Sequence, residues 1–251
     1  MLRVDAVERP AFGLSEDHPP FRGDWHAHRR PQLLYAAAGT LHLEVGEARW
    51  LLPPARAAWI GPGVAHRVDA PGPVALRTVY FGPEAPPAAA ASCVFAVDAL
   101  ARELILLAMR FGPDGPADPL AAPVFATLEG LCRAWVQQPL PWRLPRAQSP
   151  ELARAMAYAE AHLDAEVGQA AVARAAGVSP RTLARRFAAE AGMSWRRYLH
   201  TARMLRAMEL LQVPGARVGE VAVAVGFTSF GAFSQAFRAF TGEAPSRFRA
   251  A

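Results

Sequence analysis

The sequence has no lysine, so each of its 27 basic residues is an arginine. Cysteine is almost as scarce: Cys93 and Cys132 are too few for a disulfide framework, and we expect both thiols to be free. No apolar run reaches the roughly 18 residues that a membrane-spanning helix needs. Residues 1–10 carry acidic side chains and lack the apolar core of a secretory signal. These absences predict a cytoplasmic protein with no membrane segment.

Positive charge is concentrated in the last two fifths of the chain. Residues 1–149 hold 14 arginines and 14 acidic residues, whereas residues 150–251 hold 13 arginines and 8 acidic residues, a net charge of +5. A basic region of this kind favours a polyanionic partner such as DNA. The complete use of arginine in place of lysine is better explained by genome composition, because Ala, Arg, Gly and Pro are abundant along the whole chain.

Residues 20–82 alternate apolar and polar side chains in short runs broken by Pro and Gly, a pattern typical of antiparallel strands in a barrel or sandwich. The clearest runs cover residues 32–37, 41–45, 57–60 and 75–81. A connector rich in Pro and Ala follows at 83–92. Residues 98–111 and 120–138 then have the apolar spacing of helices, and the pattern is helical from Pro150 onward.

These patterns predict an α+β protein with two domains. The expected parts are an N-terminal β-barrel (1–97), a helical segment (98–138), a Pro-rich linker (139–149) and an all-α domain (150–251). The helical segment has more apolar side chains than one small barrel face requires: Leu100, Leu104, Leu107, Phe125, Leu128 and Leu131. Because two-fold dimers are the commonest soluble oligomers, we expect these helices to pair two copies of the chain into a homodimer.

The all-α region contains a weak internal repeat. Its anchor residues occur 50 positions apart: Ser179 and Ser229, Leu183 and Phe233, Phe187 and Phe237, Gly192 and Gly242. In each copy a short helix (169–176 or 218–225) leads to a turn glycine (Gly177 or Gly226), then to a serine suited to cap a second helix. Apolar residues four positions apart on that second helix provide its buried side. The repeat predicts two helix-turn-helix units joined by one longer helix over 195–211.

The region 150–251 resembles the DNA-binding domain of AraC/XylS-type transcriptional regulators. Two helix-turn-helix units at this spacing carry the resemblance, together with the closing stretch VGFTSFGAFSQAFRAFTGEAPSRFR. The resemblance implies a sequence-specific transcriptional regulator that binds double-stranded DNA and is not an enzyme.

The DNA contacts are expected on the exposed face of the second helix of each unit. With Leu183 and Phe187 turned inward, the first unit presents Arg181, Thr182 and Arg185, with Arg186 at the edge. The corresponding residues of the second unit are Phe230, Gly231, Ser234 and Gln235, with Arg238 beside them. Arginine can read guanine and glutamine can read adenine, whereas Arg186 and Arg238 are placed for phosphate or for solvent. Gly231 has no side chain, which indicates that the first unit carries more of the base readout.

Two segments of the N-terminal region bear histidines. Residues 23–39 contain His26, His28 and Gln32, and His66 follows the Gly- and Pro-containing turn at 61–65. Side chains two residues apart on a strand point to the same face, so His26 and His28 can enter one lumen. Both segments resemble motifs of the cupin superfamily, a small β-barrel that often holds a metal through three histidines and a carboxylate.

The cupin resemblance implies one zinc, iron or nickel ion on a ligand set of His26, His28, Gln32 and His66. Gln32 stands where cupins usually have a glutamate and is a weaker ligand, so the alternative is a pocket lined by histidines without metal. Several AraC-type regulators with such barrels bind small molecules there. This implies a small-molecule effector, with three aromatic residues near its pocket: Trp25, Tyr35 and Trp59.

Two functions compete for the whole chain. The first is a transcriptional regulator that responds to a small-molecule effector, a metal or both in its cupin-like domain. The alternative is a metal-dependent cupin enzyme fused to a DNA-binding tail. A catalytic cupin is expected to keep a full ligand set and a nearby acid or base. Because Gln32 replaces the glutamate and the basic helical region is the best-formed part, we favour the regulator.

Overall fold

The computed structural model describes residues 3–83 and 92–249, which form two compact units. Unit 1 comprises Met1–Gly46 and Trp50–Pro141, and unit 2 comprises Glu47–Arg49 and Trp142–Ala251. Residues 84–91 of the expected Pro- and Ala-rich connector lie outside the described residues. Within the described ranges, no helix is long and apolar enough to cross a membrane.

Unit 1 opens with a short 3-10 helix, η1 (Val4–Ala6), and is built on two sheets. The first sheet has the antiparallel order β1 (Phe12–His18), β8 (Val74–Tyr80), β3 (Gln32–Ala38), β6 (Arg56–Ile60) and β9 (Cys93–Ala96). The second contains, in order, β5 (Ala48–Leu52), β4 (Leu41–Val45), β7 (His66–Ala70) and β2 (Phe21–Arg22). The four runs of alternating residues in the sequence are confirmed as β3, β4, β6 and β8.

The expected succession of strands and then helices is confirmed, but the sheets do not close into the expected cupin-like barrel. Among the described residues, the two sheets are not joined into one continuous ladder. The segment between β2 and β3 makes a single bridge, between His26 and His66.

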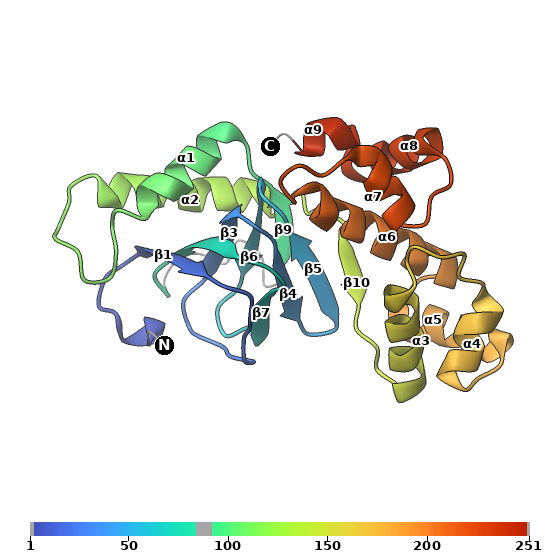
Figure 1. Cartoon of the computed structure of the whole chain (residues 1–251). Coiled ribbons are helices and arrows are strands. Elements are labelled where there is room, and N and C mark those ends of the chain that lie inside the picture. The colour runs from blue at the N-terminus through green and yellow to red at the C-terminus, as the bar shows by residue number, and fades with distance from the viewer. Residues whose placement is uncertain (1–2, 84–91, 250–251) are drawn as a thin grey trace. The chain divides into compact units, whose positions relative to one another are not determined.

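Two helices cover one face of the first sheet, α1 (Ala99–Ala108) and α2 (Ala121–Trp135), and Figure 1 shows them side by side. The carboxylate of Asp98 caps α1 by accepting a hydrogen bond of 2.8 Å from the backbone N–H of Ala101. Both helices bury apolar side chains in one core with the sheet. Leu128 is fully buried there, whereas Leu100 is 69% exposed. The apolar surplus expected for pairing is therefore partly used inside the unit itself.

Unit 2 is helical apart from β10 (Arg143–Pro145), a short strand in the segment expected as a linker. Its helices are α3 (Pro150–Ala161), α4 (Gln169–Ala176), α5 (Pro180–Ala191), α6 (Trp195–Leu211), α7 (Val218–Ala224), α8 (Phe230–Thr241) and α9 (Pro245–Arg249). In Figure 1 the long helix α6 connects one group, α3 to α5, to a second group, α7 to α9. The predicted bounds of α4 and α6 are confirmed to the residue.

The two helix-turn-helix units have the predicted turns and caps. Gly177 and Gly226 adopt φ of 72° and 75°, a left-handed conformation that glycine accepts without the steric penalty of a Cβ. Ser179 caps α5 and Ser229 caps α8, each through its hydroxyl oxygen, and Pro180 occupies the first turn of α5. The predicted anchors are fully buried: Leu183, Phe187, Phe233 and Phe237. Short-range sequence signals therefore fix both units.

Candidate DNA-binding surface and histidine site

The outer face of α5 presents two arginines that are available to a ligand. Arg181 and Arg185 are exposed, and neither has a side-chain hydrogen bond or ion pair to another residue in the described part of the chain. Thr182 is half-buried, and its Oγ1 lies 2.9 Å from Oγ of Ser179. The free guanidinium groups on this face suit guanine or phosphate.

Arg186 differs from its neighbours because it is held by acidic groups of its own unit. Its Nη1 lies 2.9 Å from Oε1 of Glu190, one turn further along α5. Its Nη2 lies 3.4 Å from Oε2 of Glu151, on α3. The pair with Glu151 ties α5 to α3, so the side chain expected at the edge of the DNA surface also joins two helices.

The outer face of α8 has less charge and more apolar surface. Phe230, the first residue of α8, is 59% exposed. A Cβ placed on Gly231 would meet only Oγ of Ser229, at 3.8 Å, so the space beside that residue is open. Gln235 and Arg238 are exposed, whereas Ser234 is half-buried. The second helix-turn-helix unit thus offers one phenyl ring, one amide and one guanidinium, whereas the first helix-turn-helix unit offers two guanidiniums.

An arginine that the sequence analysis missed joins the segment between α3 and α4 to the turn of the second helix-turn-helix unit. Arg203 of α6 donates hydrogen bonds to the carbonyl oxygens of Leu163, at 3.1 Å from Nε, and Ala165, at 2.7 Å from Nη2. Burial lowers the pKa of Arg203 from its usual value. A Cβ on Gly226 would lie 2.5 Å from both Nη2 of Arg203 and the carbonyl oxygen of Leu163. The turn of the second helix-turn-helix unit therefore packs directly on this arginine and on the segment between α3 and α4.

The first unit has a looser version of the same arrangement. Arg154 of α3 lies 49 positions before Arg203, the same offset as between Gly177 and Gly226. Its Nη2 donates to the carbonyl oxygen of Ala176 at 3.0 Å. A Cβ on Gly177 would lie 3.9 Å from this Nη2 atom, a much looser contact than that of Gly226 with Arg203. The offset of 49 between these arginines could have identified them from the sequence.

The histidines converge although His26 and His28 do not share a regular strand. Residues 23–31 are irregular apart from the bridge at His26. The N–H of His26 donates to the carbonyl oxygen of His66 at 3.0 Å, and the N–H of His66 donates to the carbonyl oxygen of His26 at 2.9 Å. The carbonyl oxygen of His28 accepts a hydrogen bond of 2.8 Å from the N–H of Gly63. Backbone contacts between the two motif segments, rather than strand alternation, thus bring the three rings together.

The three imidazoles share one orientation pattern. Each has its Nδ1 beside a backbone carbonyl oxygen: Asp24 for His26 at 2.9 Å, Arg30 for His28 at 2.7 Å, and Val64 for His66 at 2.8 Å. A carbonyl only accepts, so Nδ1 carries the proton and the lone pair of a neutral ring lies on Nε2. One ligand atom from each histidine lies within 4.8 Å of the other two.

Nε2 of His66 is buried and has no hydrogen-bond partner in the described part of the chain. Burial, the largest cause, lowers the pKa of His66 to about 4, and this ring is therefore neutral at pH 7. A neutral imidazole with an unshared, buried lone pair is the form in which histidine binds a transition metal.

Gln32 lies beside this cluster and is also buried. Its Oε1 is 3.0 Å from Nε2 of His28. When Nδ1 of His28 carries the proton, both atoms of this contact are acceptors and no hydrogen lies between them. A cation bound to both atoms would stabilise this arrangement. Rotating the amide by 180° would instead let its NH2 group donate to His28. The same four residues can therefore line a metal site or a metal-free polar pocket.

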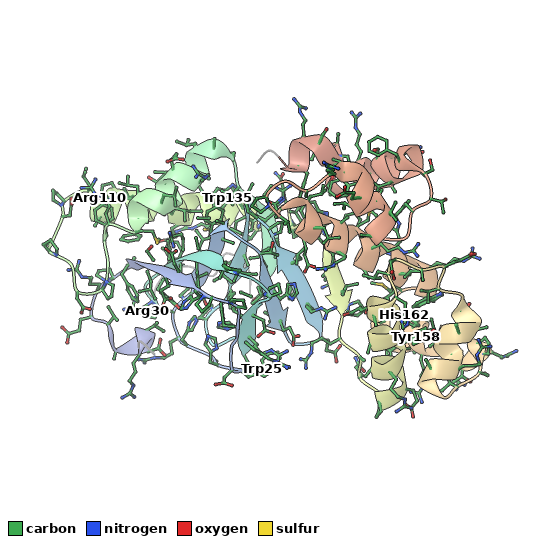
Figure 2. The ribbon with its side chains drawn as sticks, viewed as in Figure 1. Trp25, Arg30, Arg110, Trp135, Tyr158 and His162 are labelled. Atoms are coloured by element: carbon green, nitrogen blue, oxygen red, sulfur yellow. The ribbon has the colours of Figure 1, made fainter. Side chains whose placement is uncertain are left out.

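The aromatic residues expected near the pocket are distributed differently. Tyr35 and Trp59 are buried in the core with α1 and α2, because they lie on the face of the first sheet opposite to Gln32. Trp25 is 41% exposed, and its ring stacks under the guanidinium of Arg67 of β7, 5.7 Å away; Figure 2 places it at the rim of the sheets. Neither Tyr35 nor Trp59 therefore lies beside the histidines.

Tyr80 is the aromatic residue that does reach the cluster. It is paired with Gln32 in the ladder between β8 and β3, and its ring centroid lies 5.3 Å from that of His28, edge to face. Burial raises the pKa of its hydroxyl well above the usual value. Tyr80 lies within the predicted strand 75–81, but which ladder partner it would have was not visible from the sequence.

Comparisons with known proteins agree with both halves of this picture. Residues 172–251 match the family model of a helix-turn-helix domain, and residues 10–122 match that of an AraC-like ligand binding domain. The chain is 31% identical over 226 residues to the HTH-type transcriptional regulator NimR of Escherichia coli (strain K12), which covers 89% of this chain and 81% of that protein.

Other regulators match a smaller part of the chain. An uncharacterized HTH-type transcriptional regulator of Mycobacterium tuberculosis is 44% identical over 69 residues, 28% of this chain and 20% of that protein. A crystal structure of an AraC-type regulator from Chromobacterium violaceum has 31% identity over 40% of this chain and 90% of its own, with a TM-score of 0.39. The relatives carry the names of regulators, which gives the enzyme alternative no support. The chain belongs to the AraC family of DNA-binding transcriptional regulators, with an AraC-like ligand-binding domain ahead of its helix-turn-helix domain.

Proposed function

We propose that this regulator binds its operator through the outer faces of α5 and α8, each placed in the major groove. The exposed and unpaired guanidinium groups of Arg181 and Arg185 support this role for α5, and Gln235 with Arg238 supports it for α8. Two recognition helices on one DNA face would lie about one helical turn apart, ~34 Å. One copy of the chain would then cover two adjacent half-turns of an asymmetric site.

We propose further that the ligand-binding domain holds one divalent transition metal, zinc, iron or nickel, on His26, His28 and His66, with Gln32 beside them. The observation that carries this proposal is the shared orientation of the imidazoles. Each ring offers its Nδ1–H to a backbone carbonyl, which is the usual way that proteins orient metal-ligating histidines. The buried Nε2 of His66, which has no hydrogen-bond partner among the described residues, supports the same proposal.

Elemental analysis tests the metal. Purified full-length protein is incubated with zinc, iron or nickel salts, passed through a desalting column and analysed for bound metal. We expect about one ion per chain for the wild type and none for a His26→Ala/His28→Ala double variant. His18→Ala is the matched control, because His18 lies outside the cluster, near Glu16. A double variant with wild-type metal content would refute the site.

A metal-free effector pocket is the second candidate. The observation that favours it is the 3.0 Å contact between Gln32 and His28, which becomes an ordinary hydrogen bond when the amide is rotated. In this case Gln32, Tyr80 and the three histidines would supply polar contacts to a small molecule. Wild-type protein without bound metal that still changes its DNA affinity with an effector would favour this candidate over the metal.

We also propose how the chain is divided into functional parts. We place the effector or metal domain at 1–97, the pairing helices at 98–138, the linker at 139–149 and the DNA-binding domain at 150–251. The exposed Leu100 and Leu120 support a homodimer contact on α1 and at the start of α2. DNA binding requires access to the genome and hence the cytoplasm of a bacterial-type cell. Sedimentation of the full chain at tens of micromolar as a strict monomer would contradict the dimer.

A further inference from the structure

Phe230 is an apolar side chain at a position where the chain is expected to meet a charged polymer. It is the first residue of α8, directly after the cap Ser229, and it is 59% exposed. Every other described phenylalanine is buried or half-buried. Phe233 and Phe237 fill the core of this helix-turn-helix unit, and the exposed ring of Phe230, at the N-terminal end of α8, is not needed for it.

The chemistry of a phenyl ring restricts what it can contact in DNA. It neither donates nor accepts a conventional hydrogen bond, so phosphates and most base edges offer it nothing. In the major groove, the apolar group is the C5-methyl of thymine, which phenylalanine is known to contact. The first residues of a recognition helix are also the ones that approach base edges. Phe230 lies in that part of α8.

The neighbours of Phe230 favour the same kind of base pair. Gly231 has no side chain and open space around it, so nothing holds the helix away from the base edges at this point. Gln235, on the next turn, is exposed and can form two hydrogen bonds with adenine. The first unit is different, because its free side chains are Arg181 and Arg185, whose geometry suits guanine.

We infer that the two units read chemically different halves of the operator: α8 reads A·T pairs, with Phe230 on a thymine methyl and Gln235 on adenine, and α5 reads guanine. This inference rests on the proposed placement of both helices in the major groove. It implies that the half-site under α8 contains a thymine whose methyl group, rather than its hydrogen-bonding edge, determines affinity.

The test begins with a randomised duplex library, from which full-length protein selects its operator. Each thymine in the selected site is then replaced by deoxyuridine, which removes only the methyl group. For one thymine under α8 we expect wild-type affinity to fall about fourfold, the loss typical of one buried methyl group. Phe230→Ala should bind the thymine and deoxyuridine duplexes equally well, and Phe230→Leu should restore part of the discrimination.

Arg185→Ala is the matched control in the other unit. It should weaken binding and relax the preference for guanine while it keeps the thymine-to-deoxyuridine difference. Because Phe230 is exposed, the Phe230→Ala variant should retain the wild-type circular dichroism and melting temperature.

Three results would overturn the inference. One is an operator in which no thymine under α8 is sensitive to loss of its methyl. Another is a Phe230→Ala variant that still discriminates thymine from deoxyuridine. The third is unchanged DNA binding by Phe230→Ala together with reduced transcriptional control, which would assign the ring to a protein partner. If Gln235→Ala and Arg238→Ala also leave DNA binding unchanged, the placement of α8 in the groove itself fails.

Discussion

The histidine site and the candidate DNA-binding surface arrange their functional atoms in opposite ways. His26 and His66 lie 40 positions apart in the chain and meet through a backbone bridge; the ring of His66 is fully buried and that of His26 is half-buried against it. Arg181 and Arg185 lie on one helix and point outward, while Leu183 and Phe187 hold that helix from behind. Substitutions in the first site should therefore alter both function and packing, whereas those on the outer helix faces should alter function alone.

The largest expected effect is at the inward site. His66→Ala removes a proposed metal ligand whose ring is fully buried, and we expect metal affinity to fall by at least about 100-fold, the upper end of losses seen for residues that only support a ligand. Competition against a chromogenic chelator measures it. The same variant should also melt at a lower temperature than the wild type in the absence of metal, because its ring is part of the interior. Equal metal affinity in His66→Ala and wild type would contradict the ligand role.

The next effect compares the two turn glycines. Gly226→Ala should lower the free energy of unfolding by about 2–3 kcal/mol, because alanine is strained at a φ of 75° and its Cβ would meet the carbonyl oxygen of Leu163 at 2.5 Å. Gly177→Ala has a similar φ but no contact closer than 3.9 Å, so it should cost only about 1 kcal/mol. Urea unfolding of the full chain distinguishes them. Equal costs would show that the second turn is not packed against Arg203 as described.

Substitutions of exposed arginines on α5 and α8 should change DNA affinity without changing the free energy of unfolding. Arg185→Ala should weaken operator binding by roughly 1–3 kcal/mol and relax the preference at one base position. Arg238→Ala should weaken all sequences alike and reduce the slope of binding against salt concentration by about one. Titrations of operator and scrambled duplexes at several salt concentrations measure both. Should Arg185→Ala keep both its affinity and its sequence preference, α5 would not read bases through that residue.

The smallest effect concerns the helix caps of the two units. Oγ of Ser179 accepts a hydrogen bond of 3.1 Å from the N–H of Thr182 and contacts its hydroxyl, whereas Oγ of Ser229 lies 3.4 Å from the N–H of Ala232. Loss of such a cap costs about 1 kcal/mol. Ser179→Ala should therefore destabilise the chain by a few tenths of a kcal/mol more than Ser229→Ala, as measured by thermal unfolding. The reverse order would indicate that the cap of α8 is the stronger one.

Much of the helical half follows from the sequence by local rules. The bounds of α4 and α6, the serine caps and the left-handed glycines are all encoded within a few residues of where they occur. A helix closes its hydrogen bonds four residues apart, so its ends and its buried side are legible in a short window. The same holds for the strands β3, β4, β6 and β8, whose alternation is visible without knowledge of their neighbours.

The tertiary structure decided which of those elements meet. Alternation on β3 separates Gln32 from Tyr35, but only the packing of α1 and α2 determines that Tyr35 faces the core and Gln32 the histidines. Other features likewise join residues far apart in the chain. They are the strand order of the two open sheets, the contact of Tyr80 with His28 and the ion pair of Arg186 with Glu151. Strand pairing and side-chain contacts of this kind depend on long-range packing, because many partners satisfy the same local pattern.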